Sequence, residues 1–205
     1  MATELELALA ASRVLPILTP KALEGLEALG EVLLENGLPL VEVTLRTPQA
    51  LEAIRRLKVL GLRVGAGTIL GEKQAERALE AGASFLVSPG LSEALVHWAG
   101  AHGVPYLPGV ATPTEVQRAL SMGCTLLKFF PAEALGGVKV LKAYAPVFSE
   151  VRFVPTGGIG AENLRSYLKL PNVLACGGSW LLEGNLGEIR AKLQDLRNLR
   201  LRAPG

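Results

Sequence analysis

Short apolar runs alternate with longer amphipathic stretches along the whole chain. The apolar runs are mostly continuous, as expected of parallel strands that helices cover on the outside. The stretches between them are rich in Leu, Ala and Glu, with apolar residues at helical spacing. We predict strands at Val14–Leu18, Leu40–Thr44, Arg63–Ala66, Phe85–Val87, Pro105–Leu107, Thr125–Phe129, Arg152–Pro155 and Val173–Cys176.

Start and stop signals delimit the helices between these strands. The clearest predicted helices are Ala22–Glu35, Pro48–Lys58, Glu72–Ala81, Glu93–His102 and Pro113–Met122. Thr47 and Thr112 each precede a proline, which predicts an N-cap followed by proline at the first helical position. Glycines stand where helices should end, at Gly37, Gly61, Gly82, Gly103 and Gly123.

Strict alternation of strands and helices demands a parallel sheet, and eight units favour its closure. We therefore predict an α/β fold, a single (β/α)8 TIM barrel over residues 1–205 without a linker. Thr3–Ser12 is an extra N-terminal helix that covers the barrel bottom, and Glu188–Arg202 is a helix on its outside. The alternative is an open doubly wound sheet. That sheet usually has a Gly-rich turn after its first strand, where this chain has Thr19 and Pro20.

Composition narrows the class of protein further. Of 205 residues, 49% are hydrophobic, which suffices for one substantial core. The net charge is +2 and the basic residues are scattered, so we expect neither a nucleic-acid nor a membrane-surface partner. The N-terminus lacks the features of a secretion signal, and charges interrupt every apolar segment before the roughly 20 residues that span a bilayer. These features favour a cytoplasmic protein.

Cysteine and histidine have positions that favour packing over metal binding. Cys124 and Cys176 each lie in an apolar run and are predicted to be reduced core residues. His97 and His102 lie in one helical segment, where we expect surface or packing roles. None of the four has ligand partners at the spacing of a structural zinc site, so no metal is expected.

Polar side chains at the carboxyl ends of the predicted strands are the candidates for chemistry, because barrel sites lie there. Alternation after the second strand places Glu42, Thr44 and Arg46 on one face and apolar residues on the other. The polar set should point into the barrel. A structural ion pair between Glu42 and Arg46 is the simpler alternative.

Lys128 stands in the apolar run of the sixth predicted strand. A lysine in such surroundings is costly to bury unless it is paired or neutral. A neutral amine is the nucleophile that attacks a ketone to form an imine. A salt-bridged or snorkelling lysine at the strand end is the alternative.

The remaining strand ends carry weaker signals. Thr68 follows glycines that let a ligand approach the backbone, although tight packing explains them equally well. Pro89 lies in a rigid turn, for which turn geometry alone is an alternative. The pairs Gly157-Gly158 and Gly177-Gly178 follow the seventh and eighth predicted strands. Barrels often bind phosphate at these two positions, so we predict phosphate binding there.

Taken in order, these segments resemble the bacterial 2-keto-3-deoxy-6-phosphogluconate (KDPG) and 4-hydroxy-2-oxoglutarate (KHG) aldolases. The resemblance extends from about Val14 to Leu182. Any one of the shared motifs is weak, but the ordered set is highly specific. They are VEVTLRT, GAGT, SPG, PGVATPTE, LKFFPAEALGG, FVPTGGI and GGSWL.

The resemblance implies a class I aldolase of the Entner–Doudoroff pathway, with a covalent imine on Lys128 and neither metal nor cofactor. Glu42 would be the general acid/base, and Arg46 and Thr68 would hold the pyruvate carboxylate. The expected reaction cleaves KDPG to pyruvate and glyceraldehyde 3-phosphate, and also KHG to pyruvate and glyoxylate. The only partners implied are a phosphorylated keto acid and further copies of the chain in a homotrimer.

The same resemblance assigns the rest of the pocket. Pro89 and Phe130 would shape it, and Thr156 would contact substrate hydroxyls. The phosphate would be bound by Gly157, Gly158, Gly178 and Ser179.

Two other functions are compatible with part of the pattern. A phosphate-binding isomerase or synthase would use Lys128 only as a charge, but it needs another acid/base group at the mouth, and the sequence offers no suitable histidine or aspartate. A non-catalytic sugar-phosphate sensor would need no buried lysine, because arginine binds anions with less desolvation cost.

Overall fold

The strands of the protein follow the predicted order closely. The computed structural model describes the backbone of residues 3–201 and the side chains of residues 3–197. The strands are β1 (Val14–Leu18), β2 (Leu40–Thr44), β3 (Arg63–Gly67), β4 (Phe85–Val87), β5 (Tyr106–Leu107), β6 (Gly109–Val110), β7 (Leu126–Phe129), β8 (Arg152–Pro155) and β9 (Cys176–Gly178).

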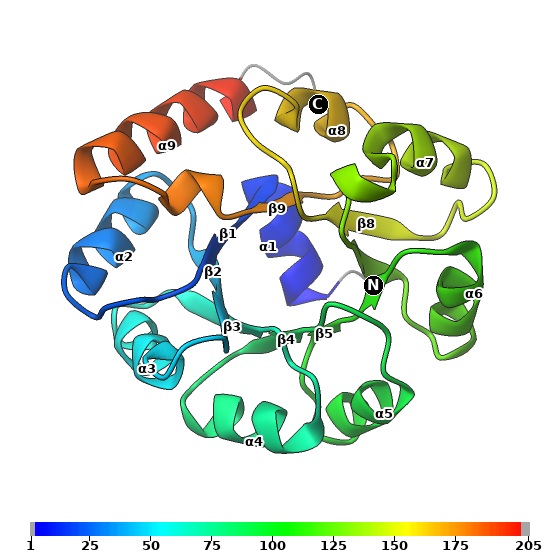
Figure 1. The fold of residues 1–205 in the computed structure, drawn as a ribbon, viewed down its shortest axis with the longest axis horizontal. Coiled ribbons are helices and arrows are strands. Elements are labelled where there is room, and N and C mark those ends of the chain that lie inside the picture. Colours follow the sequence, from blue (N-terminus) through cyan, green and yellow to red (C-terminus); the bar gives the residue numbers. More distant parts are fainter. Residues whose placement is uncertain (1–2, 202–205) are drawn as a thin grey trace.

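Helices surround these strands, as Figure 1 shows, with α1 lying across the middle of the ring. The α-helices are α1 (Glu4–Ser12), α2 (Leu26–Glu35), α3 (Ala50–Val59), α4 (Glu72–Glu80), α5 (Glu93–Ala101), α6 (Pro113–Ser121), α7 (Gly137–Tyr144), α8 (Leu164–Leu168) and α9 (Leu186–Leu201). Two short 3-10 helices, η1 (Glu133–Leu135) and η2 (Trp180–Leu182), follow β7 and β9. Arg202, the predicted end of the last helix, lies outside the described residues. Between residues 3 and 201, no helix has the length and apolarity to cross a membrane.

The strands form two parallel sheets. One is a curled sheet of six strands in the order β5-β4-β3-β2-β1-β9, and the other is β6-β7-β8. Pro108 alone separates β5 from β6, and its carbonyl accepts the backbone N–H of Lys128 at 2.8 Å. On the other side, isolated bridges join Phe153 to Val173 and Thr156 to Gly177. The predicted parallel α/β alternation is confirmed. The hydrogen-bonded ladder is interrupted at Pro108, which lacks a backbone donor, and between the β8 and β9 segments, which are joined by two isolated bridges instead of a continuous ladder.

Side-chain alternation in the strands separates two apolar clusters. Val41 and Val43 pack with the helices in the outer cluster. Leu40 belongs to an inner cluster that α1 completes with Leu5 and Leu9, which are 2% and 0% exposed. The prediction of an N-terminal helix over one end of the strands is confirmed. That end is closed by packed side chains, so the polar residues must lie toward the other end.

The helix starts were predicted with mixed success. Thr112 caps α6 as expected, and its hydroxyl and the Glu115 carboxylate form a capping box with Pro113 in the first turn. The prediction at Thr47 was wrong, because α3 begins two residues after Pro48 and has Gln49 at its N-cap. The first predicted helix also starts late, since residues 22–25 are not helical and α2 begins at Leu26.

Arg13 ties the amino end of β1 to the segment before β9. Its guanidinium donates to the carbonyls of Leu174 at 2.9 Å, Val173 at 3.4 Å and Leu168 at 2.7 Å. The backbone of this segment is bonded to Phe153 of β8, so the charge-assisted hydrogen bonds from Arg13 help to hold it between β1 and β8.

Arg13→Met should therefore lower the free energy of unfolding by about 2–3 kcal/mol, because it keeps the aliphatic stem but removes hydrogen bonds from a charged donor. Urea denaturation followed by circular dichroism measures the change. Arg152→Met is the matched control, since Arg152 is exposed and its guanidinium donates to the nearby Ser149 and Val151 carbonyls. A loss equal to that of the control would contradict the proposed role of Arg13.

Candidate active site

A cavity of about 250 Å³ opens at the carboxyl ends of the strands. All eleven site residues predicted from the sequence line it: Glu42, Arg46, Thr68, Pro89, Lys128, Phe130, Thr156, Gly157, Gly158, Gly178 and Ser179. Four further residues line the cavity. Ile17 and Ile159 had no predicted role, whereas Thr44 was predicted on the inner face and Gly177 in the second glycine pair. The fold thus brings together residues from strands far apart in the sequence, and their chemical roles stay predictions.

Lys128 lies on β7 with its side chain only 8% exposed. Its Nζ is 3.5 Å from Oε1 of Glu42, whose side chain is 2% exposed, and 5.3 Å from the centre of the Phe130 ring. The other carboxylate oxygen, Glu42 Oε2, is buried without a hydrogen-bond partner among the residues described. A buried acceptor left open in this way is suited to a proton-bearing ligand or water in the cavity.

Room for this carboxylate comes from a glycine on the neighbouring strand. Gly67 stands opposite Thr44 in the parallel register of β2 and β3. A Cβ atom added to Gly67 would lie 2.0 Å from Oε1 of Glu42. The glycine of the GAGT segment is therefore explained by the position of the Glu42 side chain.

Arg46 does not pair with Glu42, contrary to the structural ion pair considered as an alternative. Among the ion pairs of the described residues, Glu42 is joined to Lys128. Arg46 donates from Nη2 to the Thr19 hydroxyl at 2.7 Å and from Nε to the Thr44 hydroxyl at 3.3 Å, and the two hydroxyls lie 2.9 Å apart. Thr19 was missed by the sequence reasoning. Thr44 was placed on the correct face by alternation, which was the available signal.

Thr68 and Pro89 form the wall beyond β3 and β4. Thr68 has a φ of 62°, a left-handed conformation that is uncommon for residues other than glycine. The Pro89 carbonyl lies so close to Gly109 that a Cβ there would be 2.2 Å from it. The backbone in this wall is tightly packed, and the strained Thr68 fits a site where geometry is constrained by more than local preference.

The segment after β8 is a glycine turn held from outside the cavity. Gly157 and Gly158 have φ values of 101° and 74°, which glycine adopts without steric cost. Glu133 donates its backbone N–H to the Gly157 carbonyl at 3.1 Å, and Asn163 Nδ2 donates to the Gly158 carbonyl at 2.9 Å. Tyr167 donates its hydroxyl to the Glu133 carboxylate. Burial, together with this carboxylate, raises the pKa of Tyr167, so the phenol keeps the proton that it donates.

The second glycine pair differs from its prediction, because Gly177 and Gly178 lie within β9 instead of following it. Packing explains both. A Cβ on Gly177 would lie 2.3 Å from the Thr156 hydroxyl, and one on Gly178 would lie 2.7 Å from the Trp180 ring. Ser179 is the first residue beyond the strand, so only one of the two pairs is a free glycine turn.

Other residues considered in the sequence lie away from this cavity. His102 stacks on Trp98 of α5 with ring centres 4.0 Å apart, a packing role as predicted. Both cysteines are free thiols, Cys176 buried and Cys124 half-buried, and burial raises the pKa of each. Within residues 3–201, no three His, Cys, Asp or Glu side chains are grouped so that they could hold a metal ion.

A parallel α/β fold with a buried lysine–glutamate pair in a small cavity at its strand ends defines a candidate enzyme for small anionic carbonyl compounds. The family model described as KDPG and KHG aldolase matches residues 5–195. The chain belongs to this family and is an aldolase, an aldehyde-lyase.

Individual relatives agree with the family. A 2-dehydro-3-deoxy-phosphogluconate aldolase of Treponema pallidum is 46% identical over 172 residues, which are 83% of this chain and 82% of the relative. The crystal structure of a 4-hydroxy-2-oxoglutarate/2-dehydro-3-deoxyphosphogluconate aldolase from TTHB1 is 56% identical, with a TM-score of 0.93 over 97% of this chain and 100% of that one. A KDPG aldolase of Legionella pneumophila, solved with pyruvate captured as a covalent carbinolamine, is 39% identical, with a TM-score of 0.90 over 95% of this chain and 98% of that one.

Gly67→Ala should lower kcat by about a hundredfold or more, because the added methyl group would displace the Glu42 carboxylate from Lys128. Gly71→Ala is the control, since a Cβ at Gly71 meets nothing within 4 Å and its φ of −175° suits any residue. Pyruvate release from KDPG measures the activity, and thermal unfolding checks that both variants are folded. Unchanged kcat in folded Gly67→Ala would contradict the requirement for this carboxylate position.

Proposed function

We propose that the chain is a class I aldolase that reversibly cleaves KDPG to pyruvate and glyceraldehyde 3-phosphate, and KHG to pyruvate and glyoxylate, through an imine on Lys128. The observation that carries this proposal is the buried Nζ of Lys128, 3.5 Å from Glu42 in a cavity lined by the predicted residues. Family membership supports the activity, and the carbinolamine seen in the Legionella relative supports the covalent route.

In the proposed reaction, Glu42 accepts a proton from Lys128, and the amine adds to the keto carbon of the substrate. Glu42 then returns this proton to the carbinolamine hydroxyl, which leaves as water, and a protonated imine remains. Glu42 takes the proton of the hydroxyl on the carbon that becomes the aldehyde, the carbon–carbon bond breaks, and the bonding electrons move into the imine to form an enamine. Protonation of the enamine and hydrolysis then release pyruvate and free Lys128.

Glu42 suits the shuttle role because its Oε2 is buried and has no hydrogen-bond partner among the described residues, so it can accept a proton from the substrate. General acid/base catalysis of this kind contributes roughly 10²–10⁴-fold to rate. Arg46 and Thr68 bind the ketoacid carboxylate in this proposal. The hydroxyls of Thr19 and Thr44 hold Arg46 beside the cavity, where its remaining N–H groups are available to a carboxylate.

The aldehyde half extends toward β8 and β9. We propose that Pro89 and Phe130 confine the substrate and that Thr156 meets its hydroxyls. The glycine turn at Gly157 and Gly158 would bind the phosphate with backbone N–H groups. Gly178 and Ser179 would complete the phosphate site from the opposite side, where the Ser179 hydroxyl is a potential donor.

Several wider features belong to the same proposal. We propose that the two sheets act as one (β/α)8 barrel, supported by the single-residue break at Pro108 and the bridges between β8 and β9. Residues 1–205 would form one catalytic domain. The Entner–Doudoroff role, the cytoplasmic location, the independence from metal and cofactor, and the homotrimer stay predictions from the resemblance, and sedimentation equilibrium would test the last.

Borohydride reduction in the presence of pyruvate tests the imine directly. The peptide containing Lys128 should gain the mass of a reduced pyruvate adduct, because reduction makes the carbon–nitrogen bond permanent. Lys128→Met should give no labelled peptide, whereas Lys139→Met, altered on the outer helix α7, should label like the unmodified protein. Label on Lys139 or Lys142, or no label at all, would contradict the assignment of the imine to Lys128.

Turnover and calorimetry on the same protein distinguish the aldolase from the two alternative functions. An isomerase or synthase that uses Lys128 as a charge should keep substantial turnover in Lys128→Arg, whereas the aldolase should lose it. A sensor should bind phosphorylated sugar acids in calorimetry without releasing pyruvate.

A further inference from the structure

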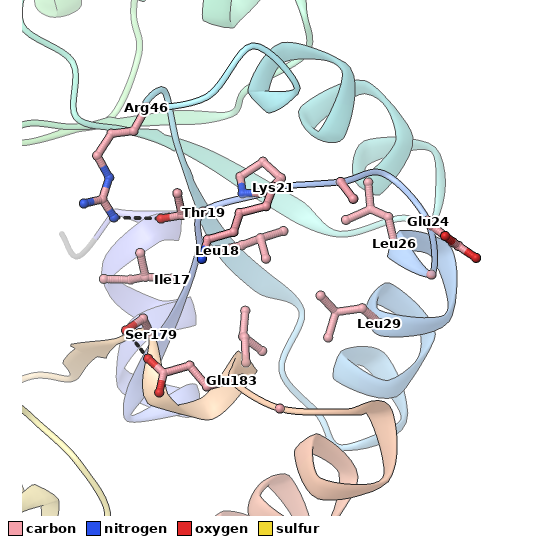
Figure 2. Close-up of a pocket in the computed structure, with 15 residues that line it drawn as sticks. Ile17, Leu18, Thr19, Lys21, Glu24, Leu26, Leu29, Arg46, Ser179 and Glu183 are labelled. Carbon is pink, nitrogen blue, oxygen red and sulfur yellow. Dashed lines mark hydrogen bonds between the residues drawn. The ribbon is translucent and has the colours of Figure 1, made fainter.

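A second and larger cavity, of about 510 Å³, adjoins the candidate active site. It lies between the segment after β1 and the η2 turn, and Figure 2 shows the side chains that line it. Ile17, Arg46 and Ser179 line both cavities, so the two share a wall. Any group bound near Ser179 is therefore exposed to the charges of the second cavity.

Ser179 is already engaged there. Its hydroxyl donates to Oε1 of Glu183 at 2.9 Å, the contact drawn as a dashed line in Figure 2. The backbone at Glu183 is held in turn, because Lys192 Nζ donates to the Glu183 carbonyl at 2.7 Å and to the Trp180 carbonyl at 3.0 Å. A fixed backbone keeps the Glu183 carboxylate beside the serine.

The second cavity is lined by side chains of both charges. Lys21 and Arg46 bring positive charge, and Glu24 and Glu183 bring negative charge. Of these four, Glu183 is the one hydrogen-bonded to Ser179. A serine hydroxyl has a single hydrogen to donate, and a phosphate monoester carries about −1.5 to −2 charges. Phosphate at Ser179 must therefore compete with the Glu183 carboxylate for the hydroxyl and is repelled by its charge.

We propose that Glu183 is a specificity-determining residue, which holds the Ser179 hydroxyl in the free enzyme and weakens binding of the phosphate end of the substrate. The inference rests on the proposed function, in which Ser179 faces that phosphate. Glu183 lowers the preference for a phosphorylated keto acid over a non-phosphorylated one. It does not touch the reacting atoms, so it leaves the chemistry at Lys128 unchanged.

Glu183→Gln isolates the charge, because glutamine keeps an oxygen that accepts the Ser179 hydrogen bond. The expected result is a rise of about three- to tenfold in kcat/KM for KDPG, which carries phosphate, with no change for KHG, which does not. The rise should shrink at high salt, since exposed charges are screened. Glu150→Gln, an exposed glutamate outside both cavities, is the matched control and should change neither value.

Calorimetric titration with inorganic phosphate gives a readout that does not depend on turnover. Glu183→Gln should lower the phosphate dissociation constant by a similar factor, and Ser179→Ala should raise it. An unchanged phosphate affinity in Glu183→Gln, or an equal gain on KHG, overturns the role of Glu183 while leaving the aldolase proposal intact. Failure of the unaltered protein to cleave either substrate overturns the proposed function instead, and the phosphate titration still decides the inference.

Discussion

The contact between Lys128 and Glu42 is the constraint around which the site is built. Both side chains are almost fully buried, 8% and 2% exposed, and their charged atoms are 3.5 Å apart. A buried ion pair is weak evidence for stability, because desolvation offsets much of the attraction. The position of this pair at the strand ends, together with the unpaired Oε2 of Glu42, is explained by a chemical role in the cavity. Removing either partner would leave a buried charge without compensation.

Glycines nearby make room for the polar side chains of the site. Gly67 is needed because the Glu42 carboxylate occupies the space that a Cβ would fill, and Gly177 is needed for the Thr156 hydroxyl in the same way. Arg46 is kept out of the pair by Thr19 and Thr44, so its charge stays available at the cavity edge. The glycines and the displaced Arg46 thus keep the strand ends from packing more tightly, and this leaves room for a ligand.

Much of the fold and the composition of the cavity could be predicted from the sequence. Period-two alternation correctly placed Glu42 and Thr44 on the inner face, and Thr112 marked its helix because the capping box is local chemistry. Features that depend on neighbours distant in the sequence were missed. Thr19 gains its role only from Arg46, and Gly178 lies inside β9 because β1 is alongside it. Thr47 looked like a cap, but the chain turns for two more residues before α3 begins. No sequence pattern pointed to Glu183, because Ser179, to which it is hydrogen-bonded, had already been assigned to phosphate binding.

The helix α1 has an effect beyond closing the inner core. Because Leu5 and Leu9 fill the amino ends of the strands, the ligand cavity has no route through the centre of the fold. In the proposed reaction, pyruvate stays on Lys128 as the enamine after the carbon–carbon bond breaks, so the aldehyde departs first. Because α1 blocks the amino end, both products must leave through the same open end of the fold.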